Sequence, residues 1–414
     1  MRVLIAGGGI GGLTLALMLH KRGIECRLSE AAPEVRPRGV GINLLPHSIL
    51  EFAALGLLPQ LDSIAIRTRR LTYTNHLGQQ IWSEPRGLYA GHDVPQFSVH
   101  RGLLHDLLWR TATERLGENA INSDERVVGF HQNSNRIVAQ IAAAGGSSKE
   151  IDGDILVGAD GIHSWLRANL HPTEPKVRWT GIKMWRGACP WPVFDGGDAM
   201  FIAGDLVSKL IVYPIAHGRM RGERLTNWVI TARVAEPNSA PPGRENWSKR
   251  GDFREFKYLA RRLRLPFIDV EPLILATEEV FEYPMCDRDP LPFWTNGRVT
   301  LLGDAAHPMY PAGSNGAAQA VLDASCLAGL LSKHSALEAL PAYESERLPA
   351  TAAIVRSNRV GGPERVLDMI SQRAPDGFER IEDVISSTEL SEISKQYAAL
   401  AGFAVSSRPA ATPS

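Results

Sequence analysis

The sequence is poor in cysteine and has no excess of charge of either sign. Of its 414 residues only four are cysteines, and Cys26, Cys189, Cys286 and Cys326 lie far apart with no Cys-x-x-Cys pair. This spacing argues against a zinc site and a disulfide framework, and it fits a reducing compartment such as the cytoplasm. Basic and acidic residues number 45 each, so the formal net charge is zero. That balance gives no electrostatic reason to expect a nucleic-acid partner.

Long apolar runs are also absent. No run of about eighteen uninterrupted apolar residues occurs, so we expect no membrane span. The first twenty residues contain five glycines and no small-residue cleavage site, which indicates a strand, a turn and a helix rather than a signal peptide. A length of 414 residues favours two structural lobes. Residues 403–414 are rich in Ser, Pro and Ala, a composition typical of a disordered tail.

A dinucleotide-binding fingerprint opens the chain. Residues 2–6 form a short apolar run that stops at Gly7, residues 11–22 have the pattern of a helix packed on a sheet, and residues 25–30 predict a second strand. The turn between them reads Gly-Gly-Gly-Ile-Gly-Gly, which satisfies Gly-x-Gly-x-x-Gly. Such glycines allow a tight turn and close approach of a pyrophosphate, and the following helix N-terminus attracts the phosphates. The fingerprint does not decide between FAD and NAD.

Two further motifs favour FAD. The block at residues 158–167 follows a predicted strand at 154–158, and the block at residues 303–316 follows another at 298–302. An NAD dehydrogenase needs neither block. A flavin needs both, because its ribityl chain and ring extend beyond the pyrophosphate and require partners from other parts of the chain. Glu30 ends the second strand, where an acid can hydrogen-bond an unphosphorylated ribose.

The middle of the chain, residues 174–285, has a different composition. It contains five tryptophans and strand-like runs at 181–187, 207–215 and 225–234. Such a segment suggests a sheet that covers a ligand cavity. The side chains that we expect to contact the substrate are Trp185, Tyr213, Trp228, Met309 and Tyr310. For each of them the alternative is a place in the hydrophobic core.

The three motifs, in this order and spacing, resemble those of the group A flavoprotein aromatic hydroxylases, the family of para-hydroxybenzoate hydroxylase. Stretches at 38–43, 82–87, 157–164 and 283–292 are similar to the phenazine-pathway branch of that family. The resemblance, over about residues 2–360, implies an α/β fold in which a Rossmann-like FAD-binding domain of the glutathione-reductase type is interleaved with a β-sheet substrate-binding domain, followed by C-terminal helices. The expected parts are an FAD-binding domain at 1–72, 98–173 and 287–360, a substrate-binding domain at 73–97 and 174–286, and a helical segment at 361–402.

The resemblance also implies which residues hold the cofactor. Arg101 is expected at the FAD phosphate and ribityl region, Asp304 at the ribitol, and residues 311–316 along the ring. Asp160 and Gly161 are expected beside the phosphates and the path of the nicotinamide coenzyme. The full expected set is Gly7, Gly9, Gly11, Gly12, Glu30, Arg36, Arg101, Val128, Asp160, Gly161, Gly303, Asp304, Pro311, Gly313, Ser314, Asn315 and Gly316.

The implied activity is hydroxylation of an aromatic or fused heteroaromatic molecule by reduced flavin and O₂, through a flavin C4a-hydroperoxide, with or without decarboxylation. NADH or NADPH would bind transiently, since no second glycine fingerprint occurs. A helix opening near Asn315 and Gly316 would stabilise the anionic reduced flavin. We expect no metal and no catalytic acid or base, with structural roles for His163 and His307. Arg186 leaves two alternatives open, a ligand for a substrate carboxylate or a surface arginine.

Two other functions remain open on the same scaffold. One is an FAD-dependent reductase or dehydrogenase, which would reduce its substrate without consuming O₂. The other is an escort protein that no longer uses flavin, against which the intact Gly9, Arg101 and Asp304 motifs argue. For the enzyme we expect a monomer or a homodimer.

Overall fold

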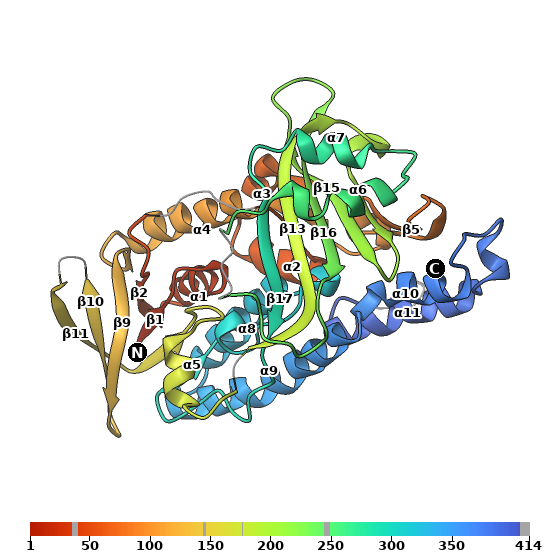
Figure 1. Ribbon diagram of the computed structural model, residues 1–414. Helices are drawn as coiled ribbons and strands as arrows, with labels where there is room; N and C mark the ends of the chain where they lie inside the picture. The colour runs from red at the N-terminus through yellow and green to blue at the C-terminus, as the bar shows by residue number, and fades with distance from the viewer. Residues whose placement is uncertain (35–39, 144–145, 176, 244–248, 406–414) are drawn as a thin grey trace, which may run out of the picture.

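The computed structural model describes residues 1–34, 40–143, 146–175, 177–243 and 249–405, and the strands of this part form four sheets (Figure 1). The α/β fold expected from the sequence is confirmed. Residues 406–414 of the predicted disordered tail lie outside the described residues. Two of the sheets position the candidate site.

The first of these is a parallel sheet with the strand order β18-β12-β1-β2-β8. Its strands are β1 (Arg2–Ala6), β2 (Glu25–Ser29), β8 (Ile121–Asn122), β12 (Ile155–Gly158) and β18 (Val299–Leu301). Helices α1 (Ile10–Lys21), α4 (Arg101–Leu116) and α8 (Gly316–Leu331) share one hydrophobic core with it. Parallel strands end at the same edge of a sheet, so the three motifs that follow β1, β12 and β18 meet there.

The second sheet has seven strands in the order β17-β13-β16-β15-β14-β5-β6. Its strands are β5 (Arg70–Asn75), β6 (Gln80–Pro85), β13 (Arg178–Pro192), β14 (Ala199–Gly204), β15 (Ser208–His217), β16 (Glu223–Arg233) and β17 (Phe281–Asp287). The three strands expected in the middle of the chain are thus present as β13, β15 and β16. Helices α6 (Lys257–Arg262) and α7 (Val270–Leu275) cover one face of this sheet with an aromatic-rich core.

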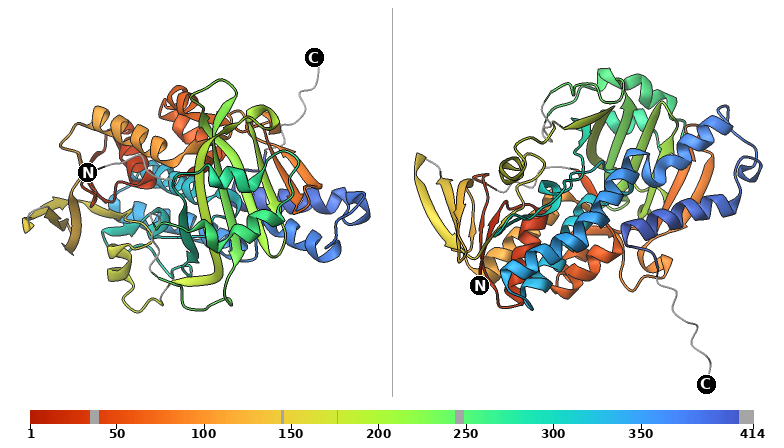
Figure 2. Two further views of the ribbon diagram at one scale, coloured as in Figure 1. Left: turned by 45° about the horizontal axis from the view of Figure 1, so that its top comes forward. Right: turned by 90° about the horizontal axis from the view of Figure 1, so that it is seen from below.

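The C-terminal helices reach the other face of the seven-stranded sheet. The long helix α9 (Ala336–Arg359) packs on α8 and runs towards this sheet, where α10 (Arg365–Arg373) and α11 (Ser387–Ala401) follow (Figure 2). Apolar residues of α10 and α11 form a third core with β5, β6, β14 and β15. Helices α6 and α7 therefore pack on one face of the sheet, and α10 and α11 pack on the other. Because successive side chains of a strand point to opposite faces, the position of a residue in the strand decides which of these helices it faces.

The remaining strands form two further sheets. An antiparallel sheet combines β9 (Glu125–Gln132), β10 (Ile137–Ala143) and β11 (Ser148–Gly153), and a small one combines β3 (Gly41–Leu44), β4 (Ala65–Arg67) and β7 (Phe97–His100). The other helices are α2 (Pro46–Ala54), α3 (Leu58–Ile64) and α5 (Trp165–Leu170). Among the described residues no helix combines the length and apolarity that crossing a membrane requires.

Candidate functional site

A large cavity lies between the carboxyl edge of the parallel sheet and the seven-stranded sheet. Its volume is about 700 Å³, and its walls come from the turn before α1, the ends of β12 and β18, and strands β13 to β16. The start of α8 and the end of α9 close it from the other side. It therefore has room for an extended ligand that meets all three sequence motifs and the sheet.

The glycines of the turn before α1 have two different roles. Gly7 has φ of +110°, and a Cβ there would lie 2.3 Å from the Ala159 carbonyl oxygen, while a Cβ on Gly12 would lie 2.1 Å from the Gly7 carbonyl oxygen. These two glycines let β1, β12 and α1 pack. Gly9 and Gly11 line the cavity, and nothing in the described part of the chain lies within 4 Å of a Cβ placed on Gly9. This open position at the N-terminus of α1 fits an FAD pyrophosphate.

Glu30 lies beside the same turn. Its Oε2 accepts the Gly8 N–H at 2.7 Å, and its Oε1 accepts the Ala32 N–H at 2.7 Å. On the other side, Nε2 of His105 of α4 lies 2.6 Å from the Gly8 carbonyl oxygen, a contact that no sequence motif indicates. Burial lowers the pKa of His105, although the bond to Gly8 opposes the shift. The turn is thus fixed from both sides, and Glu30 as a ribose ligand stays a prediction.

Arg101 and Asp304 bring opposite charges into the cavity. Arg101 begins α4, Asp304 follows β18 in the turn η5 (Gly303–Ala305), and both line the cavity wall. Burial lowers the pKa of Arg101, and the nearby Asp304 opposes this shift. Burial raises the pKa of Asp304, and His307 and Arg101 oppose that shift. A phosphate beside the arginine and ribityl hydroxyls beside the carboxylate would compensate this loss of water.

A buried ionic cluster holds the Asp304 turn from α8. The Asp323 carboxylate accepts the Gly303 N–H at 3.0 Å and lies 2.5 Å from His307 Nε2, and Arg347 Nε donates to it at 2.8 Å. Burial alone would raise the pKa of Asp323, but His307 and Arg347 lower it to about 2. His307 is therefore part of a supporting network, as expected from the sequence.

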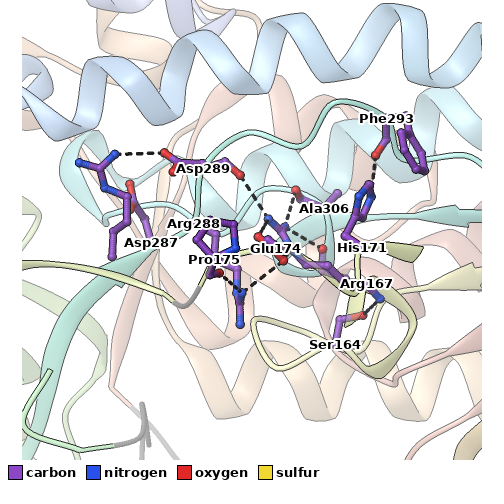
Figure 3. A network of polar contacts seen from close by, with 12 residues as sticks. Ser164, Arg167, His171, Glu174, Pro175, Asp287, Arg288, Asp289, Phe293 and Ala306 are labelled. Atoms are coloured by element: carbon purple, nitrogen blue, oxygen red, sulfur yellow. Dashed lines mark hydrogen bonds and ion pairs between the residues drawn. The ribbon is translucent and has the colours of Figure 1, made fainter. Parts of the chain in front are cut away.

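Arg167 of α5 supports the same turn. Its buried guanidinium donates to the carbonyl oxygens of Ala305 at 3.1 Å and Ala306 at 2.8 Å, and it pairs with Glu174 (Figure 3). Ser164 caps the helix α5 that carries Arg167 by accepting the Arg167 N–H at 2.9 Å. The motif at residues 158–167 therefore acts on the cavity partly through its last residue, to which the sequence assigned no role.

The side chain of Asp160 is hydrogen-bonded to the start of α5. Ala159 and Gly161, the residues on either side of it, line the cavity, and Asp160 Oδ2 accepts the N–H of Trp165 at 2.8 Å. Burial raises the pKa of this carboxyl group, and the backbone N–H groups of α5 oppose the shift. Asp160 thus supports the first turn of α5 beside the cap Ser164, and its place near the phosphates and the nicotinamide coenzyme stays a prediction.

The segment 311–316 forms one end of the cavity. Pro311, Ser314, Asn315 and Gly316 line it, as does Ala312 in the turn η6 (Ala312–Ser314). Helix α8 begins at Gly316, so its N-terminal N–H groups open towards the cavity, as the sequence predicted. Gly313 is an exception among the expected contacts. It faces away from the cavity, towards Tyr397 of α11.

Two further residues of the expected cofactor set remain, Val128 and Arg36. Val128 lies on β9, is 40% exposed and is not part of the cavity wall. Arg36 lies outside the described residues. Among the described residues no group of three or more His, Cys, Asp or Glu side chains could hold a metal ion.

The expected substrate residues separate into two groups. Tyr213, Met309 and Tyr310 line the cavity. The expectation for Trp185 and Trp228 is wrong, because both are buried under α6 and α7 on the opposite face of the sheet. Trp185 stacks on Phe256 with ring centroids 5.0 Å apart, and Trp228 Nε1 donates to Thr277 Oγ1 at 2.8 Å.

Arg186 faces the cavity because it is one residue away from Trp185. It is only 9% exposed and lines the wall with Met184, two residues earlier on β13. The alternative of a surface arginine is therefore wrong. Burial, with a smaller effect of the nearby Arg101, lowers the pKa of Arg186 to about 9, so the side chain is still a cation at neutral pH. The cavity thus offers a buried positive charge from the seven-stranded sheet.

Comparisons with known proteins agree with this architecture. A family model described as an FAD binding domain matches residues 1–235 and 279–358. A phenazine 1,6-dicarboxylic acid hydroxylase of Lysobacter antibioticus is 44% identical, with 86% of this chain and 89% of the relative covered. An aurachin C monooxygenase/isomerase of Stigmatella aurantiaca is 32% identical, with 87% and 89% covered. The structure of Klebsiella pneumoniae HpxO with FAD and uric acid shares the fold at a TM-score of 0.70 and 22% identity, covering 98% of this chain and 93% of that one.

Proposed function

Since this chain belongs to the family of FAD-binding aromatic hydroxylases, we propose that it hydroxylates a fused-ring aromatic carboxylate. It is an FAD-dependent monooxygenase that consumes NAD(P)H and O₂. The sequence left a reductase and a flavin-free escort protein open, but the curated relatives are hydroxylases and monooxygenases and support neither alternative.

The cavity residues fit the part of FAD from the pyrophosphate to the ring. We propose that Gly9 and the N-terminus of α1 bind the pyrophosphate, that Arg101 and Asp304 bind the phosphate and ribityl region, and that residues 311–316 meet the ring. Bound FAD would supply the redox chemistry, accepting hydride from NAD(P)H and activating O₂. The N–H groups at the start of α8 favour negative charge at that end of the cavity. Bound FAD and substrate would fill the cavity and exclude bulk water from the reacting groups.

Arg186 is the observation that carries the substrate proposal. The guanidinium of Arg186 lines the cavity, and a guanidinium binds a carboxylate through two parallel hydrogen bonds. Met184, Tyr213 and Tyr310 supply the apolar and aromatic surface of the same cavity. A flat aromatic acid combines both requirements. The relative from Lysobacter antibioticus is named for such a compound, a phenazine dicarboxylic acid.

A matched pair of arginine variants tests this proposal. FAD-loaded protein is assayed with NADH or NADPH and a series of phenazine, quinoline and benzene carboxylic acids, each beside its carboxamide. Arg186→Gln should raise KM for the preferred acid about 10- to 100-fold, the range expected for a charged hydrogen bond, and leave KM for the carboxamide unchanged. Arg233→Gln is the control, because Arg233 lies exposed at the rim of the same cavity and donates to the Thr180 carbonyl oxygen.

Equal effects of the two variants on KM, or no effect of Arg186→Gln, would contradict the role of Arg186. Mass analysis of the product separates simple hydroxylation from hydroxylation with loss of the carboxylate.

We further propose that the reaction takes place in the cytoplasm, where NAD(P)H is supplied. No disulfide joins Cys26, Cys189, Cys286 and Cys326 in the part of the chain that the structure describes, in keeping with a reducing compartment. One chain by itself surrounds the cavity, so a monomer or a homodimer would suffice.

A further inference from the structure

The segment that we assign to the flavin ring has an unusual backbone. Gly313 has φ of +69° and the next residue, Ser314, has φ of +56°. Gly313 adopts the left-handed conformation without steric cost, but this conformation is unfavourable for Ser314, which has a Cβ and requires support from its surroundings. Ser314 Oγ accepts a hydrogen bond from Asn43 Nδ2 at 3.2 Å on one side. The stronger support comes from the C-terminal helices.

Tyr397 of α11 contacts this segment directly. Its buried hydroxyl lies 3.1 Å from the Ala312 carbonyl oxygen and 3.1 Å from Asn358 Oδ1, so its one proton is shared between two acceptors. Asn358 Nδ2 donates to the Tyr310 carbonyl oxygen at 2.9 Å, which fixes the orientation of the amide. The pair thus holds the carbonyl groups on both sides of Pro311.

The Tyr397 ring also excludes any side chain from the adjacent position. A Cβ on Gly313 would lie 2.1 Å from the Tyr397 hydroxyl oxygen and 2.4 Å from its ring carbons. A second contact reinforces the arrangement, since Gln319 of α8 donates both to Asn315 Oδ1 at 3.1 Å and to the Ala401 carbonyl oxygen at 3.2 Å. The end of α11 is therefore packed against the back of the cavity wall.

Tyr397 lies beyond the part of the chain that the family model matches, which ends at residue 358. We propose that Tyr397 is a positioning residue for the monooxygenase reaction. Its hydroxyl holds the turn Ala312–Ser314 in the one conformation that presents Pro311 and the start of α8 to the flavin ring. The inference rests on the proposed assignment of residues 311–316 to the ring, and it gives the C-terminal helices a role in the site.

The test compares two buried tyrosines that each donate to a backbone carbonyl oxygen. Tyr397→Phe removes the hydroxyl at the cavity wall, and Tyr343→Phe removes one that donates to the Leu301 carbonyl oxygen at 3.0 Å. The FAD dissociation constant, the visible spectrum of bound FAD and its reduction potential are measured without aromatic substrate. Melting curves of the apo-proteins establish that both variants are folded.

Tyr397→Phe should raise the FAD dissociation constant about three- to tenfold, the effect of one net hydrogen bond, and should shift the flavin absorption bands and reduction potential. Tyr343→Phe should lower only the melting temperature. If Tyr397→Phe likewise changes only the melting temperature, its role is structural and the inference is wrong.

A variant within the segment separates this failure from failure of the ring assignment. Pro311→Ala acts on the exposed cavity face of the segment. If Pro311→Ala changes the flavin spectrum and Tyr397→Phe does not, only the role of Tyr397 fails. If neither variant changes the spectrum, the segment does not contact the ring and both proposals fail. Since no aromatic substrate is present, a wrong assignment of Arg186 leaves these measurements unaffected.

Discussion

Asp323→Asn tests how the Asp304 turn is supported. In the folded protein the carboxylate is fully buried and accepts hydrogen bonds from Gly303, His307 and Arg347. The substitution keeps the shape of the side chain and removes its charge. Arg347 then loses its buried carboxylate partner and retains Gln319 Oε1, to which it donates at 2.6 Å.

The size of the effect follows from the cluster itself. The pKa of Asp323 falls from 3.8 to about 2 on folding. At roughly 1.4 kcal/mol for each pKa unit, this shift corresponds to on the order of 2 to 3 kcal/mol of folding free energy. Loss of one partner from a buried ion pair costs about 3 to 5 kcal/mol. We therefore expect Asp323→Asn to lower the free energy of unfolding by about 3 kcal/mol at neutral pH.

The pH dependence gives the sign of the effect. Because the folded-state pKa of Asp323 is below its unfolded value, its contribution is fully present above about pH 4 and is lost as pH falls towards 2. Urea denaturation of parent and variant at a series of pH values measures this difference. Glu389→Gln is the control, since it breaks an exposed pair with Arg373 and should leave stability unchanged. An Asp323→Asn protein as stable as the parent at neutral pH would refute the reasoning.

Three further substitutions have distinct expected outcomes. Asp304→Ala should weaken FAD binding while the fold survives, and an unchanged flavin occupancy would count against its ribityl role. Glu30→Ala should weaken FAD binding by roughly 1.5–3 kcal/mol, the value of a charge-assisted hydrogen bond, and equal dissociation constants for variant and parent would refute the ribose contact. Trp228→Phe should lower the free energy of unfolding by about 1–3 kcal/mol, because Thr277 loses its buried partner, and should leave substrate KM unchanged. A raised KM in that variant would contradict the placement of Trp228 on the face of the sheet opposite the cavity.

The sequence predicted the convergence of the three motifs because each follows a short buried strand. Gly9, Asp304 and Gly316 therefore reach one cavity through the topology of a parallel sheet, which strand patterns indicate well. The alternation of a strand was less informative. It places Trp185 and Arg186 on opposite faces but does not tell which face has the cavity, and both faces of this sheet are covered. The tryptophans were therefore assigned to the wrong side.

Contacts between distant parts of the chain were not predictable. Nothing around His105 indicates that its ring meets the Gly8 carbonyl oxygen, and nothing around Tyr397 indicates Gly313 as its neighbour. The left-handed φ of Gly313 explains a glycine there, whereas the family resemblance implies contact with the cofactor. Such positions are decided by the packing of the whole molecule.

The measurement that tests the central claim most directly is the fate of isotopically labelled O₂. FAD-loaded protein is incubated with NAD(P)H, labelled O₂ and the aromatic carboxylate that most stimulates NAD(P)H oxidation. The account predicts one labelled oxygen atom in the aromatic product, with NAD(P)H, O₂ and product in equal amounts. A reduced substrate formed without O₂ uptake would contradict it, as would O₂ uptake that yields only H₂O₂ with every aromatic carboxylate tested.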